Sequence, residues 1–249
     1  MYYEEYGSDQ NPVIVFLHGA NFIHSFGRQY VLSDRFHIIV PHIMGYGNEA
    51  NKTFDAEKAT VALAEFIRGL GNKVSLVGFS LGAQLAVKLI AEYAELFEKA
   101  IIVSPWLIKK EPELSQVMNI NKKQLDSMKK PFLCNIIGLM NGLPKSQRTE
   151  FVKQMQNVSY ETQRNMVDNG ITLETVRGFE NAKIPMIGIA GVKEQHSIID
   201  SVKSLSEMND NCNIEIWEKA AHNIPPVFAK RFNSLINDFI GNNQKRKLD

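Results

Sequence analysis

Short apolar runs alternate along the chain with longer stretches of helical period. Five of the runs are rich in β-branched residues and are bounded by turn residues, at 13–17, 36–40, 74–77, 100–103 and 185–190. Short continuous apolar runs are typical of strands in a parallel sheet that is covered on both faces. We expect residues 214–217 to form a last strand and residues 2–6 an antiparallel strand at the opposite edge.

Helical periodicity fills the gaps between these runs. The segment 56–70 has apolar residues at intervals of three and four and is followed by a glycine, which is a common helix stop. Segments 81–93 and 227–240 have the same character, and Pro225-Pro226 suits the first turn of the last helix. This alternation predicts an α/β fold with a mostly parallel central sheet and helices on both faces.

The stretch 105–184 interrupts the alternation. It holds no convincing strand, and about 80 residues is too long for a structureless connection in a compact domain. Helical signals recur through it, at 121–129, 146–156, 159–169 and 172–179. We therefore expect a core formed by residues 1–104 and 185–249, and a helical lid, residues 105–184, inserted between two strands.

The sharpest local motif is Gly78-Phe79-Ser80-Leu81-Gly82. It stands between the predicted strand 74–77 and the predicted helix 81–93. A serine on so tight a strand-to-helix turn adopts strained backbone angles, and a glycine two positions to either side lets the turn close. The placement indicates a nucleophile, and the alternative is a glycine-flanked serine in an ordinary turn.

A second motif, Leu17-His18-Gly19-Ala20-Asn21, follows the first central strand. Together with the Ser80 turn it resembles the α/β-hydrolase family, and the resemblance covers the core elements over 2–103 and 185–240. It implies that Ser80 is a nucleophile and that the backbone N–H groups of Ala20 and Leu81 form an oxyanion hole. Such fixed dipoles stabilise the tetrahedral oxyanion as it develops.

His222 is the expected general base. It follows the last predicted strand, lies in a loop, and comes after Ser80, as the family's order of Ser, acid and His implies. An imidazole with a pKa near 6.5 can take the serine proton at neutral pH and return it to the leaving group. Structural or polar roles are expected for the other histidines, with His18 holding its loop and His24 a candidate for the mouth of the pocket.

The resemblance implies a carboxylate in the loop after the strand that follows the insertion, where the family often has Gly-x-x-Asp. This chain has Gly191-Val192-Lys193-Glu194, so Glu194 occupies the position of the acid. Its role would be to fix the tautomer of His222 and to stabilise the imidazolium. Asp200, six residues further on in a predicted helix, is the competing candidate.

The insertion and the loops beside Ser80 are rich in apolar residues. Trp106 from the insertion, with Phe22, Phe79 and Ile224 near the proposed catalytic residues, is expected to wall a pocket that favours an apolar acyl or alcohol group. The predicted function is hydrolysis of a small to medium carboxylic ester, thioester or lactone through an acyl-enzyme, with no metal and no cofactor.

Two other functions fit the same residues. A cofactor-free peroxidase or a carbon–carbon bond hydrolase can use the same fold and triad, since fold does not fix function. A ligand receptor that kept the pocket and lost turnover belongs to another class, and an intact Ser80, His222 and oxyanion loop argue against it.

The composition limits the kinds of molecule that the protein is expected to bind. The 28 Lys and Arg residues against 27 Asp and Glu give a net charge of +1, which provides no basic footprint for nucleic acid and no broad attraction to anionic lipid. The N-terminus is acidic and aromatic rather than signal-like, and Cys134 and Cys212 form no disulfide framework. We expect a cytoplasmic protein that binds a small molecule, with residues 244–247 as a solvated tail. The pattern does not indicate an oligomeric state.

Overall fold

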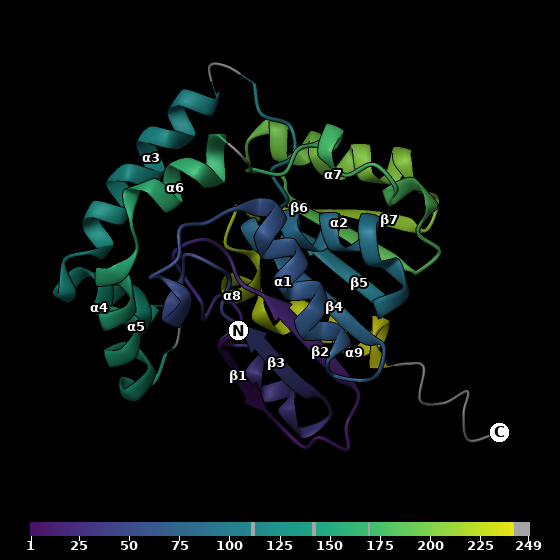
Figure 1. The fold of residues 1–249 in the computed structure, drawn as a ribbon, viewed down its shortest axis with the longest axis horizontal. Coiled ribbons are helices and arrows are strands. Elements are labelled where there is room, and N and C mark those ends of the chain that lie inside the picture. The colour runs from purple at the N-terminus through teal and green to yellow at the C-terminus, as the bar shows by residue number, and fades with distance from the viewer. Residues whose placement is uncertain (111–112, 141–142, 169, 242–249) are drawn as a thin grey trace.

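Seven strands form one sheet in the described part of the chain, in the order β1-β3-β2-β4-β5-β6-β7 (Figure 1). The structure is a computed structural model that describes residues 1–110, 113–140, 143–168 and 170–241. β1 runs antiparallel to β3, and every other pairing is parallel. The strands are β1 Tyr3–Tyr6, β2 Val13–Leu17, β3 His37–Pro41, β4 Val74–Phe79, β5 Phe97–Val103, β6 Met186–Gly191 and β7 Cys212–Trp217. The predicted α/β fold and its antiparallel edge strand are confirmed.

Both faces of the sheet are buried. In β2, Val15 and Leu17 pack into one hydrophobic core, while Ile14 and Phe16 pack into the other, and all four side chains are inaccessible to solvent. The first core also holds residues of α1 (Ala56–Arg68), α2 (Leu81–Tyr93) and α7 (His196–Met208), whereas the second holds residues of α9 (Ala229–Phe239). In Figure 1, α1 and α2 lie in front of the sheet and α9 lies behind it. Because the side chains of β2 are buried whichever way they point, this central strand is apolar throughout.

The C-terminal helical region differs from the expectation of one helix over 227–240. The two prolines belong to a separate short helix, α8 (Ile224–Val227), and α9 begins only at Ala229. Phe228 between them has φ −103° and ψ 33°, outside the helical region. Short 3-10 helices cover Tyr30–Asp34, Gly47–Glu49 and Ala94–Leu96.

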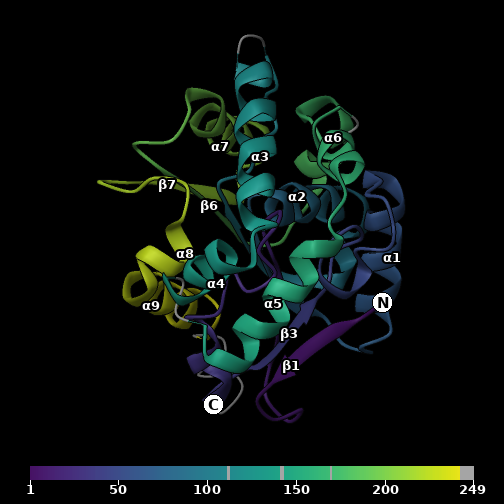
Figure 2. The same ribbon diagram turned by 90° about the vertical axis from the view of Figure 1, so that its left-hand side faces the viewer.

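Within the described residues, four α-helices lie between β5 and β6, namely α3 (Glu113–Met128), α4 (Pro131–Met140), α5 (Lys145–Asn157) and α6 (Tyr160–Asp168). They stand to one side of the sheet in Figure 1 and face the viewer in Figure 2. α4 was not expected, because its sequence is apolar almost throughout and shows no helical alternation. The expected helix at 172–179 is instead two 3-10 turns, Leu173–Thr175 and Phe179–Asn181, separated by Gly178 in a left-handed conformation with φ 103°.

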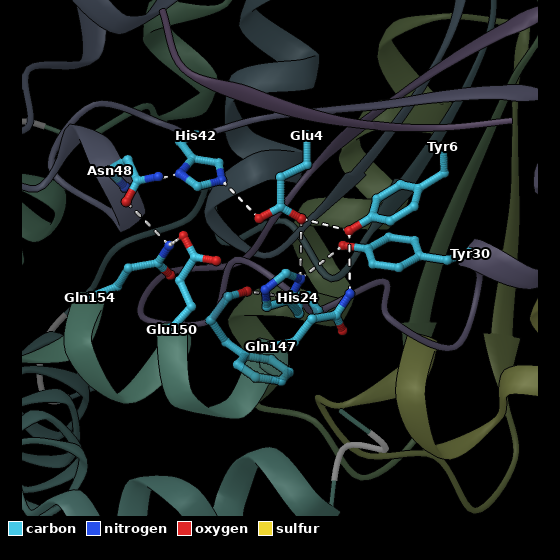
Figure 3. A network of polar contacts seen from close by, with 11 residues as sticks. Glu4, Tyr6, His24, Tyr30, His42, Asn48, Gln147, Glu150 and Gln154 are labelled. Carbon is cyan, nitrogen blue, oxygen red and sulfur yellow. Dashed lines mark hydrogen bonds and ion pairs between the residues drawn. The ribbon is translucent and has the colours of Figure 1, made fainter. Parts of the chain in front are cut away.

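A network of polar side chains joins α5 to the sheet (Figure 3). Nε2 of Gln154 donates to Oδ1 of Asn48 at 3.3 Å, and Nε2 of Gln147 lies 3.4 Å from the hydroxyl of Tyr6. Glu4 lies at the centre, 3.4 Å from Nε2 of His42 and 3.7 Å from Nδ1 of His24. These contacts tie the insertion to β1 and to the loops after β2 and β3. They also place His24 in this network and not at the pocket mouth.

The connection order reverses between β2 and β4. From β2 the chain moves to β3 on one side, and it then returns to form β4 on the other side. Ligands bind at such a reversal, beyond the carboxyl ends of the strands. Among the residues described, none of the helices is both long and apolar enough to cross a lipid bilayer. The basic segment 244–247 lies outside the described residues.

Candidate active site

Ser80 occupies a strained turn at the junction of β4 and α2. Its φ of 53° and ψ of −114° lie outside the regions that L residues normally adopt. A Cβ on Gly78 would lie 2.4 Å from the carbonyl oxygen of Gly82, and a Cβ on Gly82 would lie 1.9 Å from that of Leu17. Both glycines are therefore required sterically. The Ser80 N–H donates to the carbonyl of Val103 at 2.9 Å, which fixes the turn to β5.

Three chain segments bring Ser80, His222 and Glu194 together. Nε2 of His222 lies 3.0 Å from Oγ of Ser80, and Nδ1 of His222 lies 2.6 Å from Oε1 of Glu194. Ser80 follows β4, Glu194 follows β6 and His222 follows β7, so all three extend from the carboxyl ends of parallel strands. With the Nδ1 proton donated to the carboxylate, Nε2 is free to accept the serine hydroxyl proton. The Phe79 ring packs against His222, with 5.1 Å between ring centroids.

The Glu194 side chain is fully buried, whereas the His222 side chain is 43% exposed. The second carboxylate oxygen, Oε2, accepts from the Ser104 hydroxyl at 2.9 Å and from the Gly191 N–H at 2.7 Å. These bonds hold the carboxylate in one orientation. The competing candidate, Asp200, lies on α7 with a side chain that is 55% exposed and an ion pair to Lys203 at 3.7 Å.

Ser104 was not singled out from the sequence. It follows β5, and its φ of 54° is unusual for a residue with a side chain. The sequence signal that could have found it is its place directly after a buried parallel strand, at the same edge of the sheet as Ser80.

The loop after β2 is braced from several directions. The Gly19 N–H donates to Oγ of Ser25 at 3.1 Å, and Asn21 adopts a left-handed φ of 63°. His18 holds the loop to the next one, because the Ile43 N–H donates to its Nε2 at 3.0 Å and its Nδ1 lies 2.8 Å from the Gly19 carbonyl. Complete burial lowers the pKa of His18 to about 3, which keeps the ring neutral.

The two amides that the family resemblance assigns to an oxyanion hole lie beside Ser80 in the fold. Ala20 lines the cavity that also contains Ser80, and Leu81 is the first residue of α2, directly after it. Within the described residues, neither the Ala20 N–H nor the Leu81 N–H donates to another protein group. The N–H groups of the first helical turn have no partner inside the helix, which leaves that of Leu81 available to a ligand.

A cavity of about 430 Å³ is lined by Ser80, Glu194 and His222. Phe22, Phe79 and Trp106 line it, as expected. Ile224 does not: it is completely buried in the second core, with Trp217 and Phe232, so the expectation that it lines the pocket is corrected. Ile224 is the first residue of α8.

Other lining residues were not identified from the sequence. They share one property, which is that only the folding of the insertion onto the sheet brings them to Ser80: Val117, Ile120, Gln124, Met128, Ile137 and Met166. Gln84 on α2, Ile198 on α7 and Lys193 after β6 also line the cavity. Apolar side chains therefore make up much of the wall. In the described part of the chain, no three His, Cys, Asp or Glu residues are grouped so as to hold a metal ion.

Comparisons with known proteins agree with this fold. Residues 14–171 match the family described as "Alpha/beta hydrolase family". Among solved structures, the chain is similar to a bromoperoxidase from Bacillus anthracis, with 19% identity, a TM-score of 0.75, and coverage of 96% of this chain and 95% of that one. It is also similar to an esterase from Exiguobacterium antarcticum, with 18% identity, a TM-score of 0.73, and coverage of 96% and 95%.

A third similar structure is a carboxylesterase from Nitrososphaera gargenis, with 14% identity, a TM-score of 0.72, and coverage of 98% of this chain and 95% of that one. At these identities the likeness concerns the fold alone.

Proposed function

The chain belongs to the alpha/beta hydrolase family, and we propose that within it the protein is a serine hydrolase that cleaves carboxylic esters. One observation carries the proposal: a strained Ser80 whose Oγ lies 3.0 Å from a histidine that is itself 2.6 Å from a buried carboxylate. A nucleophile, a base within hydrogen-bond reach, and a third group that orients the base are the parts that covalent acyl transfer needs.

In the proposed mechanism, Ser80 attacks the ester carbonyl while Nε2 of His222 takes its proton. Glu194 stabilises the resulting imidazolium. The N–H groups of Ala20 and Leu81 bind the oxyanion of the tetrahedral intermediate. His222 then gives its proton to the leaving alkoxide, which departs as the alcohol and leaves an acyl-enzyme on Ser80. Water, deprotonated by His222, hydrolyses the acyl-enzyme and releases the acid.

The insertion supports a substrate of small to medium size. We propose that residues 105–184 act as a lid, because α3, α4 and α6 supply Val117, Met128, Ile137 and Met166 to the cavity wall. A cavity of about 430 Å³ lies within the range of roughly 300–1,000 Å³ for small-molecule pockets. The bulk of an ester would be bound by apolar contacts, and a thioester or lactone would present the same carbonyl to Ser80.

The first test compares the purified wild type with Ser80→Ala on short p-nitrophenyl esters. We expect Ser80→Ala to lose at least about 10³-fold in kcat, with unchanged circular dichroism and an unchanged melting temperature. Equal turnover by the two proteins would contradict the proposal.

If the protein were instead a peroxidase or a carbon–carbon bond hydrolase with the same triad, the wild type would cleave no ester. Ser80→Ala would then lose the peroxidase or carbon–carbon bond hydrolase activity of the wild type. A ligand receptor would show no Ser80-dependent activity at all.

A further inference from the structure

Two buried amide side chains join the insertion to the loop that follows β2. Nε2 of Gln163, on α6, donates to Oδ1 of Asn21. Gln163 is 6% exposed and Asn21 is 3% exposed, so the contact is shielded from water. Asn21 directly follows Ala20, whose N–H the proposed mechanism assigns to the oxyanion hole. The insertion therefore contacts this loop at the residue next to the proposed donor.

The loop contains a tight turn whose two ends are fixed. The Phe22 N–H donates to the Gly19 carbonyl at 3.4 Å, which closes the turn over residues 19–22. Ser25 holds both ends, because its Oγ accepts from the Gly19 N–H at 3.1 Å and donates to the Phe22 carbonyl. None of these bonds involves the two central residues of the turn.

The centre of the turn is held by the insertion. Ala20 and Asn21 occupy it, and in the described part of the chain the contact with Gln163 is the only hydrogen bond that either residue makes. Asn21 has a φ of 63°, in the left-handed region that an asparagine tolerates better than most residues with a side chain. The bond to its side chain stabilises this conformation and holds the peptide that joins Asn21 to Ala20.

The helix that carries Gln163 is itself anchored. The Phe54 N–H donates to Oγ1 of Thr162 at 3.3 Å, and Nδ2 of Asn165 donates to the Phe54 carbonyl at 3.3 Å. Thr162 and Asn165 stand on either side of Gln163 in the sequence, and they bind α6 to the segment that precedes α1. The Gln163 side chain therefore reaches Asn21 from a fixed position.

An oxyanion donor is effective when it is held in place before the reaction begins. Without Gln163, the buried Oδ1 of Asn21 would lack a donor, which disfavours the observed conformation of the turn. We infer that Gln163 is a positioning residue, which through Asn21 fixes the turn that presents the Ala20 N–H to the oxyanion. This inference rests on the proposed function, and it makes the chemical step depend on a residue of the insertion.

The kinetic test is Gln163→Met, which keeps the length of the side chain and removes its donor. The interaction with the oxyanion strengthens as charge develops in the transition state, so poorer positioning of Ala20 should lower kcat and leave KM unchanged. On p-nitrophenyl butyrate we expect kcat to fall at least about fivefold and KM to stay within about twofold of the wild-type value.

Gln154→Met is the matched control. Gln154, on α5, is 4% exposed, and its Nε2 donates to Oδ1 of Asn48 at 3.3 Å (Figure 3). This bond also joins a buried glutamine of the insertion to an asparagine of the core, but Asn48 does not line the cavity that contains Ser80. Gln154→Met should therefore leave kcat unchanged. Equal losses of kcat in Gln154→Met and Gln163→Met would overturn the inference, because they would report the docking of the insertion as a whole.

A double-mutant cycle tests whether Gln163 acts through Asn21. Asn21→Gly removes the acceptor and keeps a residue that adopts a positive φ readily. Its kcat should fall by a factor similar to that of Gln163→Met, and the double variant should be no slower than the slower of the two single variants. Losses that multiply in the double variant would overturn the inference.

A second readout does not depend on turnover. Phenylboronic acid mimics the tetrahedral intermediate, because its boron accepts an electron pair from Oγ of Ser80 while His222 takes the hydroxyl proton, and one boronate oxygen then occupies the oxyanion hole. Its Kd, measured by calorimetry, should rise in Gln163→Met by about the factor by which kcat falls and stay unchanged in Gln154→Met. Equal Kd values in Gln163→Met and the wild type would overturn the inference.

Failure of the inference and failure of the proposed function give different results. Binding of phenylboronic acid that requires Ser80 and weakens in Gln163→Met, without any ester hydrolysis by the wild type, would refute the proposed function and leave the inference standing. Ester hydrolysis with the same kcat in Gln163→Met and Gln154→Met would refute the inference alone. Neither hydrolysis nor binding by the wild type would refute both.

Discussion

Nδ1 of His222 lies 2.6 Å from Oε1 of Glu194, a carboxylate that is entirely shielded from solvent. Charge-assisted contacts of this kind orient an imidazole and hold its proton on Nδ1. In Glu194→Gln the amide can present its N–H₂ to Nδ1 and so favour the wrong tautomer. We predict that kcat for ester hydrolysis falls by about 10³- to 10⁴-fold.

Asp200→Asn provides the matched control for Glu194→Gln. Its carboxylate is exposed on α7 and pairs with Lys203, so the substitution should change kcat by less than about twofold. Steady-state kinetics on one p-nitrophenyl ester compares the two variants directly. The assignment of Glu194 fails if Asp200→Asn is the more damaging change.

Ser104 is expected to position Glu194. Its hydroxyl donates to Oε2 of Glu194 at 2.9 Å, beside the Gly191 N–H at 2.7 Å. Ser104→Ala removes one of these two bonds and leaves the other, so the carboxylate should remain in place with more freedom. We predict a fall in kcat of about 5- to 30-fold, equivalent to roughly 1–2 kcal/mol, with little change in KM.

An exposed serine serves as the control for Ser104→Ala. Ser234 lies exposed on α9, and its hydroxyl donates to Oδ2 of Asp238 at 3.2 Å, so Ser234→Ala should leave kcat unchanged. If Ser104→Ala and Ser234→Ala lost the same amount of kcat, Ser104 would not be a positioning residue for Glu194.

Gly82 permits the close approach of α2 to β2. A Cβ at this position would lie 1.9 Å from the Leu17 carbonyl oxygen, a distance that only a backbone shift can relieve. We predict that Gly82→Ala lowers the free energy of unfolding by more than about 3 kcal/mol or prevents folding. Urea denaturation followed by circular dichroism measures the change.

Gly69→Ala is the control for Gly82→Ala, because it adds the same methyl group at a glycine that the backbone approaches less closely. Gly69 has helical angles, φ −65° and ψ −16°, at the end of α1, so alanine fits its backbone and should change stability by less than about 1 kcal/mol. If Gly82→Ala were as stable as Gly69→Ala, the steric account of the nucleophile turn would be wrong.

Stability should decrease as the pH falls below neutrality. Burial lowers the pKa of His18 from its usual 6.5 to about 3, so the unfolded chain binds this proton at a pH where the folded protein does not. The stability associated with His18 is complete above about pH 7.5 and is lost progressively as the pH falls toward 3. At pH 5 the loss is about 2 kcal/mol.

His24 should also make the folded protein less stable as the pH falls, because burial lowers its pKa as well. Urea denaturation at pH 5, 6, 7 and 8 measures the slope, and His18→Gln should reduce it. A free energy of unfolding that is constant or rises from pH 7 to pH 5 would contradict this account of His18.

The sheet was predictable because its determinants are local. A strand buried on both faces must be apolar throughout, and the turn at Ser80 needs Gly78 and Gly82 at fixed spacing. The histidine and the carboxylate were located by their positions after strands and by the family resemblance, since neither carries a local signal of its own.

Other features depend on tertiary contacts that no local pattern encodes. α4 is apolar almost throughout, so periodicity gives no sign of it. Ile224 stands two residues after His222 in the sequence, yet its side chain does not line the cavity and packs into the second core with Trp217 and Phe232. Trp106 and Gln84 line one cavity only because the chain after β5 folds beside α2.

Ser80 forms an acyl-enzyme in the proposed mechanism, and rapid mixing of the protein with excess p-nitrophenyl ester detects this intermediate. We expect a burst of p-nitrophenol of about one equivalent per protein whenever deacylation is the slower step. After acid quenching, mass spectrometry should find the acyl group on the peptide that contains Ser80, and a fluorophosphonate should label the same residue. Neither adduct should form in Ser80→Ala. An acyl or phosphonyl adduct on any other residue, or no adduct from either reagent in the wild type, would show that Ser80 is not the nucleophile.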